Sequence, residues 1–262
     1  MTVADREHLE PLRTNLQRVR EVVDAACQRA GRPPDRVRLV AVTKYVDLSV
    51  VRALLAMGVG EIGENRVQQL VARAAALGTR FDDFAPDFRW GTPAASAVTS
   101  PRWHMIGHLQ RNKVRAVLPH VRIIHSIDSL RLAAELDKVA AALDAPVEGL
   151  IEVNVSGEQS KFGVTPADLP ALLESLRPLS HLRLRGLMTM APFDPDPEHA
   201  RPHFARLRDL SQRLRGSGTL EPDCTELSMG MSQDYGVAVE EGATLVRVGS
   251  ALFEGLPGEP AG

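Results

Sequence analysis

Short apolar runs rich in β-branched residues alternate along the chain with alanine- and leucine-rich segments whose apolar positions recur every three or four residues. The apolar runs predict eight strands, at 37–44, 59–64, 103–107, 121–127, 149–155, 182–189, 224–229 and 243–250. The segments between them predict seven helices, at 49–57, 65–77, 109–116, 128–143, 167–177, 198–215 and 232–241. Strands that alternate with helices form parallel sheets, and eight such units in about 220 residues suit a closed barrel better than an open sheet. The pattern therefore predicts an α/β protein with a single (β/α)8 TIM-type barrel.

An extra helix is predicted ahead of the first strand. Its apolar stripe recurs at helical spacing, at Leu9, Leu12, Leu16, Val19 and Val23. A glycine and two prolines within 31–34 end the pattern. No internal repeat or shift in composition indicates a second domain, so residues 1–262 are predicted to form one domain.

Two predicted helices begin with residues suited to capping. Thr165 is followed by a proline and then by Asp168, which suits an N-cap with an acid in the first turn. Asn65 and Gln68 have the spacing of a capping box, in which each side chain binds the other residue's backbone N–H.

Two segments fall outside the alternating pattern. Residues 79–102 mix proline, glycine, serine and alanine with three phenylalanines, which predicts a surface loop inserted between the second and third strands. Residues 256–262 are predicted to be a disordered tail, because terminal segments rich in glycine and proline have little to bury.

Composition and charge argue against several classes of function. The 262 residues are 44% hydrophobic, 24% charged and 4% aromatic, with a net charge of −2, so no nucleic-acid or anionic-membrane surface is expected. The charged N-terminus and the lack of a long apolar run predict neither a signal peptide nor a membrane span. Cys27 and Cys224 have no metal-binding spacing and fit a reducing compartment. We therefore expect a cytoplasmic protein.

Lys44 is the first candidate for chemistry, because it ends the first predicted strand. In barrels of this kind, functional groups lie at the carboxyl ends of the strands. Partial burial there lowers the pKa of a lysine and frees its amine to attack a carbonyl group. Position alone is equally consistent with a lysine whose ammonium group simply reaches the solvent.

The loops after the last two strands form the second candidate. Residues 229–231 make a tight turn, and Ser232 is expected to begin a helix, whose free N–H groups favour a phosphate. Gly249 and Ser250 follow the last strand and offer further donors, at the usual phosphate site of this architecture. Taken alone, Ser232 is equally well explained as an ordinary N-cap.

Arg247 alternates with Val246 and Val248 in the last predicted strand. If the valines face the helices, the guanidinium faces the barrel interior, where an unpaired charge is costly. The alternative to a functional role is a structural ion pair, with Glu61, Glu152 or Glu226.

Histidine pairs with a spacing of four residues are weaker signals. His104 begins a strand, so the helical geometry that would let it chelate a metal with His108 is not available. His199 and His203 lie on a predicted surface helix that carries no third ligand nearby. No metal site is predicted.

Several motifs, taken in chain order, resemble those of the YggS/PROSC family of pyridoxal phosphate homeostasis proteins. They are VAVTK ending at Lys44, GENRVQQ at 63–69, WHMIGHLQRNKV at 103–114, NVSGEQSKFGV at 154–164, RGLMTM at 185–190, SMGMSQDY at 228–235 and VRVGSALFEG at 246–255. The resemblance spans roughly residues 10–255, and it is the combination of motifs that is specific. It implies a fold type III barrel like the N-terminal domain of alanine racemase, without that enzyme's second domain.

The resemblance also implies a cofactor, pyridoxal 5′-phosphate, and a role for each matching residue. Lys44 would form the Schiff base, Arg247 would meet the pyridine nitrogen, and Lys161 would help to move the cofactor in or out. The phosphate group would be bound by Ser232, Gly249 and Ser250. The remaining cofactor-lining positions would be Asn65, Met105, Ile106, Gly107 and His108. The chain departs from the family at Arg66, where tyrosine is common, and in the longer insertion at 79–102.

The resemblance favours a cofactor-binding protein in vitamin B6 homeostasis and delivery, without catalytic residues. An arginine at the pyridine nitrogen makes the ring a poorer electron sink, and racemisation needs a second base. The expected partners are pyridoxal phosphate and apo-enzymes that use it, with the chain itself a monomer. A single-domain racemase is the main alternative. A Schiff-base aldolase acting on a phosphosugar is a third reading, made without the resemblance.

Overall fold

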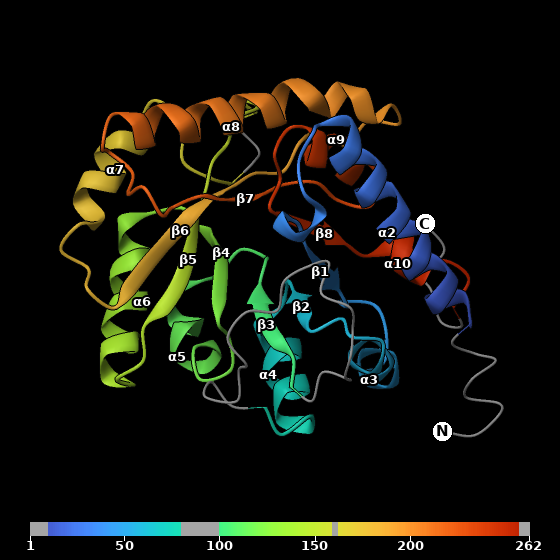
Figure 1. Ribbon diagram of the computed structural model, residues 1–262. Coiled ribbons are helices and arrows are strands. Elements are labelled where there is room, and N and C mark those ends of the chain that lie inside the picture. Colours follow the sequence, from blue (N-terminus) through green and yellow to red (C-terminus); the bar gives the residue numbers. More distant parts are fainter. Residues whose placement is uncertain (1–9, 80–99, 159–161, 257–262) are drawn as a thin grey trace.

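The computed structural model describes residues 10–79, 100–158 and 162–256, which form a closed barrel of parallel strands surrounded by helices (Figure 1). The strands neighbour one another in chain order, and β8 pairs with β1 to close the barrel. They are β1 (Arg38–Val42), β2 (Glu61–Glu64), β3 (Arg102–Met105), β4 (Ile123–Ile127), β5 (Val147–Glu152), β6 (Leu182–Met188), β7 (Glu226–Ser228) and β8 (Leu245–Val248). The predicted (β/α)8 barrel is confirmed, with strands that are mostly shorter than the apolar runs.

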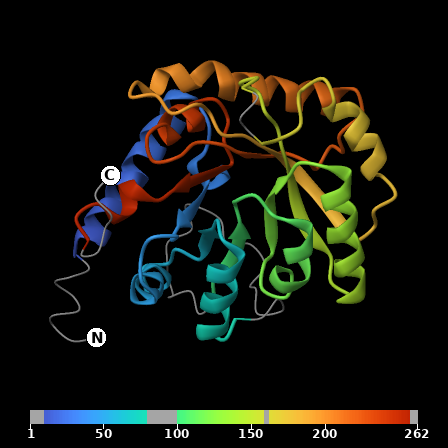
Figure 2. The ribbon, with the colours of Figure 1, turned by 180° about the vertical axis from the view of Figure 1, so that it is seen from behind.

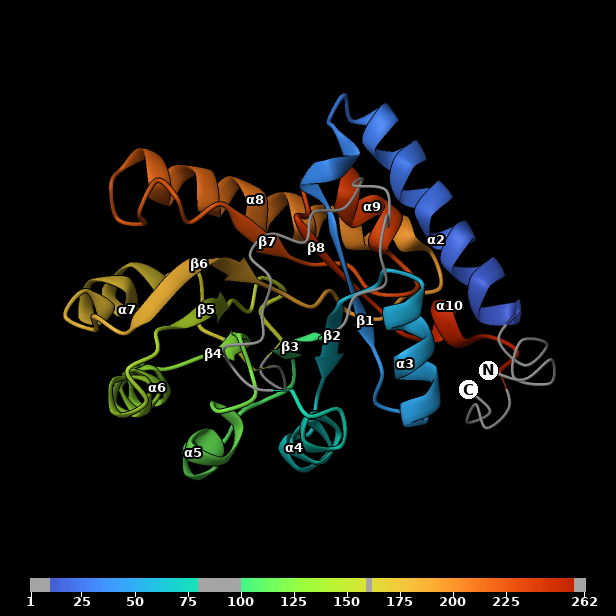
Figure 3. The ribbon, with the colours of Figure 1, turned by 60° about the horizontal axis from the view of Figure 1, so that its bottom comes forward.

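Helices follow the strands and lie on the outside of the barrel, as Figures 2 and 3 show. They are α3 (Leu48–Ala56), α4 (Val67–Ala76), α5 (Val114–Val117), α6 (Leu130–Ala142), α7 (Leu169–Leu176), α8 (Arg201–Gly216), α9 (Tyr235–Glu240) and α10 (Ser250–Phe253). Short 3₁₀ helices occur at Pro34–Arg36, Arg111–Lys113 and Pro197–Ala200. None of the helices in the described part of the chain is long and apolar enough to cross a bilayer.

The extra N-terminal helix, α2 (Glu10–Arg29), lies alongside α9 and α10 (Figure 3). The four stripe residues that fall within it, from Leu12 to Val23, are each at most 3% exposed. Asn15, also buried, donates hydrogen bonds from Nδ2 to the carbonyl oxygens of Leu252 (3.2 Å) and Glu254 (2.8 Å). The apolar stripe therefore packs α2 against the helices before and after β8.

Side chains alternate between the two faces of the strands. In β3, Trp103 and Met105 belong to the large core between strands and helices, whereas His104 between them contacts other strands from inside the barrel. Only a small apolar cluster fills the interior, formed by Val40, Leu150, Met188 and Leu245 with Ile106 against it. The rest of the interior described below is polar, which is unusual for a barrel core and marks this space for function.

Several local expectations are corrected by the structure. The N-cap of α4 is Arg66 without a side-chain cap, so Asn65 and Gln68 form no capping box. Thr165 does accept a hydrogen bond from the Asp168 N–H (3.2 Å), but it caps a turn that precedes α7. In the same way, α9 begins at Tyr235, three residues after Ser232.

The two irregular segments lie mostly outside the described residues. The ends of the predicted loop at 79–102 are ordered: Thr79 is buried and accepts a hydrogen bond from Trp103 Nε1 (3.0 Å), and Arg102 begins β3. Leu256, the first residue of the predicted tail, is only 6% exposed and belongs to the core.

Candidate functional site

The loops that carry Lys44 and Gly249 lie next to each other at the carboxyl end of the barrel. Their strands are neighbours, with Ala41 of β1 in register with Val248 of β8. A Cβ atom placed on Gly249 would lie 3.3 Å from the carbonyl oxygen of Val42, so the two backbones approach closely. The fold thus brings the candidate lysine and the candidate phosphate loop to one place.

Lys44 is half-buried, and its Nζ lies 4.7 Å from the centroid of the Tyr45 ring. Among the described residues no carboxylate forms an ion pair with Lys44, so its amine is not committed to a structural role. Its backbone is held from α4, because Gln69 Nε2 donates a hydrogen bond to the Lys44 carbonyl oxygen (2.9 Å).

Arg73 and Glu64 also fix the loop that carries Lys44. Arg73 donates hydrogen bonds to the carbonyl oxygens of Thr43 (2.7 Å) and Val46, which flank the lysine, and to the Glu64 carboxylate. Thr43 Oγ1 donates to the same carboxylate (2.5 Å). Burial raises the pKa of Glu64, while the Thr43 hydrogen bond and the Arg73 charge oppose that rise. The position of Lys44 is therefore set by a buried ion pair.

The loops after β7 and β8 meet at the Ser232 hydroxyl. Its oxygen accepts hydrogen bonds from the backbone N–H groups of Gly249 (3.0 Å) and Ala251 (3.3 Å). The tight turn before it depends on Gly230, which has φ of +92° and where a Cβ would lie 2.5 Å from the Cβ of Ala238. Ser250 follows Gly249 and is exposed. Two backbone donors from the segment after β8 thus converge on one oxygen from the loop after β7, and a phosphate oxygen is bound by converging donors of this kind.

Arg247 is 4% exposed and points into the barrel, as the alternation of β8 predicts. It donates hydrogen bonds to Ser228 Oγ (2.5 Å) and to the Thr189 carbonyl oxygen (3.0 Å), both neutral acceptors. Burial lowers its pKa to about 10, against the opposing charges of Glu152 and Asp234.

The alternative role of Arg247 in a structural ion pair is not found among the described residues. Two of the three candidate carboxylates are paired elsewhere: Glu226 lies 2.6 Å from Arg38, and Glu61 lies 3.4 Å from Arg102. Arg247 is therefore a fixed, charged donor without an adjacent counter-ion.

Glu152 is a functional candidate that the sequence did not single out. It ends β5, is 3% exposed, and its pKa is raised from the usual 4.5 to about 7 by burial and by the charge of Asp128, with Arg247 opposing. The alternation of β5 places its side chain inside the barrel beside Leu150 of the interior cluster. A buried carboxyl group that titrates near neutrality is typical of functional sites.

Asn65 and Gly107 bring the ends of β2 and β3 together. A Cβ on Gly107 would lie 2.4 Å from the Asn65 carbonyl oxygen, so only glycine fits there. Asn65 Oδ1 is buried without a hydrogen-bond partner among the described residues. Ile106 packs on the interior apolar cluster, but Met105 is fully buried in the outer core. The structure therefore does not bring the Met105 side chain to the mouth of the barrel.

His108 belongs to a more exposed part of the mouth. Its ring stacks on Phe162 with centroids 4.3 Å apart, and its Nδ1 lies 3.4 Å from Asp128 Oδ2. Both aromatic rings border a groove of about 660 Å³ that is also lined by Arg111 and Arg131. Lys161 lies outside the described residues, directly before Phe162 in the chain. Arg66 is exposed at the start of α4.

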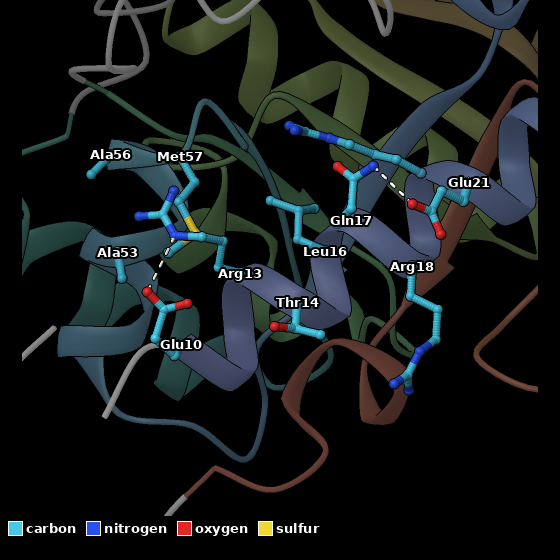
Figure 4. A pocket seen from close by; sticks show the side chains of 11 residues that line it. Glu10, Arg13, Thr14, Leu16, Gln17, Arg18, Glu21, Ala53, Ala56 and Met57 are labelled. Atoms are coloured by element: carbon cyan, nitrogen blue, oxygen red, sulfur yellow. Dashed lines mark hydrogen bonds and ion pairs between the residues drawn. The ribbon is translucent and has the colours of Figure 1, made fainter. Parts of the chain in front are cut away.

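A larger groove of about 1070 Å³ lies between α2 and α3, and none of the predicted site residues lines it (Figure 4). Its charged side chains form exposed pairs, such as Arg13 with Glu10 at 3.9 Å and Arg18 with Glu254 at 3.3 Å. Gln17 likewise donates to Glu21 at 3.0 Å. Such exposed pairs indicate a solvated surface. No group of three or more potential metal ligands occurs among the residues that the structure describes.

Comparison with known proteins places the chain in a family. Residues 8–257 match the family model of the alanine racemase N-terminal domain. The pyridoxal phosphate homeostasis protein of Aquifex aeolicus is 39% identical over 91% of this chain and 95% of its own length. That of Pseudomonas aeruginosa is 40% identical over 91% of this chain and 93% of its own. The chain belongs to the pyridoxal phosphate homeostasis protein family.

Solved structures agree with this family assignment. PipY of Synechococcus elongatus with pyridoxal phosphate bound is 34% identical, covers 88% of this chain and 99% of its own, and has a TM-score of 0.71. The alanine racemase of Clostridium difficile shares the fold with a TM-score of 0.68 at 14% identity. This chain covers only 60% of that racemase. The family members thus match the barrel over nearly their full length, and the racemase contains more than the barrel.

Proposed function

We propose that this chain binds pyridoxal 5′-phosphate at the mouth of the barrel, as a Schiff base on Lys44, and stores and delivers it without catalytic turnover. The observation that carries the proposal is the convergence of the Gly249 and Ala251 N–H groups on Ser232 Oγ beside the loop of Lys44. A binding site for its phosphate group and a reactive amine are the two features that this cofactor needs. The name of the family and the bound cofactor in PipY support the same reading.

The remaining residues at the mouth also fit the cofactor. Arg247 can only donate hydrogen bonds, and it would leave the pyridine nitrogen without a proton. Asn65 Oδ1, buried and without a partner among the described residues, is available to a polar group of the ligand. When bound, the cofactor supplies an aldehyde that captures amines reversibly and a ring that withdraws electrons. With an unprotonated ring nitrogen, that withdrawal is weak, which favours storage over catalysis.

The positions of the two tyrosines also favour storage over catalysis. The sequence contains two tyrosines. Tyr235 is 8% exposed within the core, and burial raises the pKa of its hydroxyl. Tyr45 is 61% exposed and adjacent to Lys44 in the chain. Neither is held as a second base opposite the lysine, which a racemase requires. We further propose that the chain is a cytoplasmic monomer whose partners are apo-enzymes that use the cofactor.

Cofactor binding is tested by the absorption spectrum of the purified protein after incubation with pyridoxal phosphate. We expect a visible band in the wild type that borohydride abolishes, and no such band in Lys44→Ala. Lys138→Ala, at a lysine that is 68% exposed on α6, is the matched control and should retain the band. A wild type without the band, or a Lys44→Ala variant with it, would overturn the proposal.

Delivery and catalysis are separated by two further assays. Reconstitution of an apo-transaminase by the loaded protein should be faster than by an equal amount of free cofactor; an equal rate would count against delivery. Amino acids incubated with the loaded protein in D2O should retain their Cα hydrogen, whereas washout would favour the racemase. Trapping of a phosphosugar instead of pyridoxal phosphate by borohydride would favour the aldolase.

A further inference from the structure

A chain of buried polar side chains crosses the inside of the barrel and ends at Arg247. It starts at Glu61 of β2 and passes through His104 of β3, His125 of β4 and Ser228 of β7. Glu61 Oε2 lies 2.5 Å from His104 Nε2, and His104 Nδ1 lies 2.8 Å from His125 Nε2. His125 Nδ1 lies 2.9 Å from Ser228 Oγ, which accepts from Arg247 Nη1 at 2.5 Å. Every member is at most 4% exposed.

The first end of this chain carries a fixed negative charge. Burial alone would raise the pKa of Glu61, but the His104 hydrogen bond and the charges of Arg102 and Arg38 lower it below its usual value. Arg38 and Arg102 lie at the amino ends of β1 and β3, with Nη1 atoms 4.0 Å and 3.4 Å from Glu61 Oε1. Glu61 is therefore a carboxylate that can only accept hydrogen bonds.

The histidines between the two ends are neutral. Burial lowers the pKa of His104, although Glu61 opposes it. The pKa of His125 is well below its usual value because of burial and the positive charges of Arg247 and Arg38. A neutral imidazole has one donor and one acceptor nitrogen. The direction of the hydrogen bond at one ring nitrogen therefore fixes the direction of the hydrogen bond at the other.

With both rings neutral, only one arrangement of protons satisfies all four contacts. Glu61 accepts, so His104 carries its proton on Nε2 and accepts on Nδ1. His125 must then donate from Nε2 and accept on Nδ1, and the Ser228 hydroxyl donates to it. The Ser228 lone pairs are left facing Arg247, which can only donate. Both ends demand the same direction, so the four contacts are satisfied together.

We propose that Glu61, His104, His125 and Ser228 act as one directional hydrogen-bond chain that positions the Arg247 guanidinium for the ring nitrogen of the cofactor. A carboxylate at the amino end of β2 thereby orients a donor in β8. The four are positioning residues, because they would act on the cofactor only through Arg247. This inference rests on the proposed binding of pyridoxal phosphate, but the direction of the chain itself does not.

The direction of the chain is tested first, on protein freed of cofactor. Labelling with ¹⁵N-histidine reports which ring nitrogen carries the proton, and His104→Gln and His125→Gln assign the two signals among the 8 histidines. We expect both rings to be neutral and protonated on Nε2 at pH 7. A proton on Nδ1 of either ring, or a charged ring, would overturn the proposal whether or not the cofactor binds.

The consequence for the cofactor is tested with two variants of similar volume at one position. His125→Leu removes both hydrogen bonds, whereas His125→Gln keeps a donor and an acceptor. With pyridoxal phosphate labelled with ¹⁵N in the ring, we expect the leucine variant to shift the ring-nitrogen signal and to weaken cofactor retention about tenfold. The glutamine variant should stay within about twofold of the wild type.

The outcomes separate this inference from the proposed function. A folded His125→Leu variant with an unchanged ring-nitrogen signal and unchanged retention would overturn the inference alone. A wild type that never binds the cofactor would overturn the proposed function, and the histidine signals would still decide the direction of the chain. If His125→Leu does not fold, Ser228→Ala replaces it, because it removes only the final acceptor before Arg247, and the same expected and contrary results apply.

Discussion

Ser232 after β7 accepts hydrogen bonds from the segment after β8, whose Gly249 packs against the end of β1, whereas His108 after β3 and Phe162 after β5 are exposed to solvent. On the first side, Arg247, Ser232 and the Lys44 backbone are all held by hydrogen bonds. On the second side, His108 and Phe162 form an exposed stack at the edge of a groove. A protein that stores a ligand and passes it on needs one side of the barrel mouth that binds the ligand and another side through which the ligand enters and leaves. We call these the holding side and the admitting side. The difference predicts that substitutions on the holding side affect stability and affinity, and those on the admitting side affect exchange.

The largest effect is expected at the Arg73–Glu64 pair beneath Lys44. Arg73→Leu leaves the Glu64 carboxylate, which is 0% exposed, without its partner and should cost about 3–5 kcal/mol in the free energy of unfolding. The double variant Glu64→Leu, Arg73→Leu removes both charges and should recover most of that loss. Urea unfolding measures both. A loss below about 1 kcal/mol in Arg73→Leu would show that the pair does not hold the loop.

Glu152 should make the stability of the protein depend on pH. Its pKa is about 7 in the folded protein against a usual 4.5, so the folded state binds more protons between these values. Stability should therefore fall as pH rises through this range, by up to roughly 3 kcal/mol, and stay at the lower value above it. Glu152→Gln should lack this fall. Glu174→Gln, at an exposed position on α7, should keep it, and equal pH profiles for both variants would contradict the assignment.

Ser232→Ala tests the phosphate contact on the holding side. The variant keeps the Gly249 and Ala251 N–H groups but loses the hydroxyl between them, so the dissociation constant for pyridoxal phosphate should rise about tenfold. Equilibrium titration followed by absorption measures the change. Ser175→Ala, at an exposed serine on α7, is the control and should bind like the wild type. Equal affinity of the two variants would remove Ser232 from the site.

The smallest effect on stability is expected on the admitting side. Phe162 is 56% exposed, so Phe162→Ala should change the free energy of unfolding by no more than about 0.5 kcal/mol. The rate of cofactor transfer to an apo-enzyme should nevertheless change about threefold, because the His108 stack at the groove is lost. Leu143→Ala, at a 44% exposed apolar residue after α6, should alter neither quantity. An unchanged rate of cofactor transfer in Phe162→Ala would contradict the assignment of different roles to the two sides of the mouth.

The periodicity of the apolar residues was sufficient to predict the barrel, because buried strands and the helices that cover them have different patterns of apolar residues. The alternation of Val246, Arg247 and Val248 correctly placed the guanidinium inside the barrel. The same alternation holds in β3, where His104 lies between Trp103 and Met105. It would have placed His104 inside the barrel and Met105 outside, which is the arrangement found.

Other features could not be predicted because they depend on contacts between distant segments. The raised pKa of Glu152 depends on burial by the closed barrel and on Asp128 from another strand end. Ser232 suits a helix cap on local grounds, but its partners are Gly249 and Ala251 from the next loop. Asn65 has the spacing of a capping box, yet the close approach of Gly107 fixes its backbone instead.

The central claim, a Schiff base on Lys44, is tested most directly by locating the attachment site. The protein loaded with pyridoxal phosphate is reduced with borohydride, digested and mapped by mass spectrometry. The account predicts one dominant phosphopyridoxyl adduct, on Lys44, which disappears in Lys44→Ala without moving to another lysine. A dominant adduct on any other lysine, or none in a loaded wild type, would contradict it.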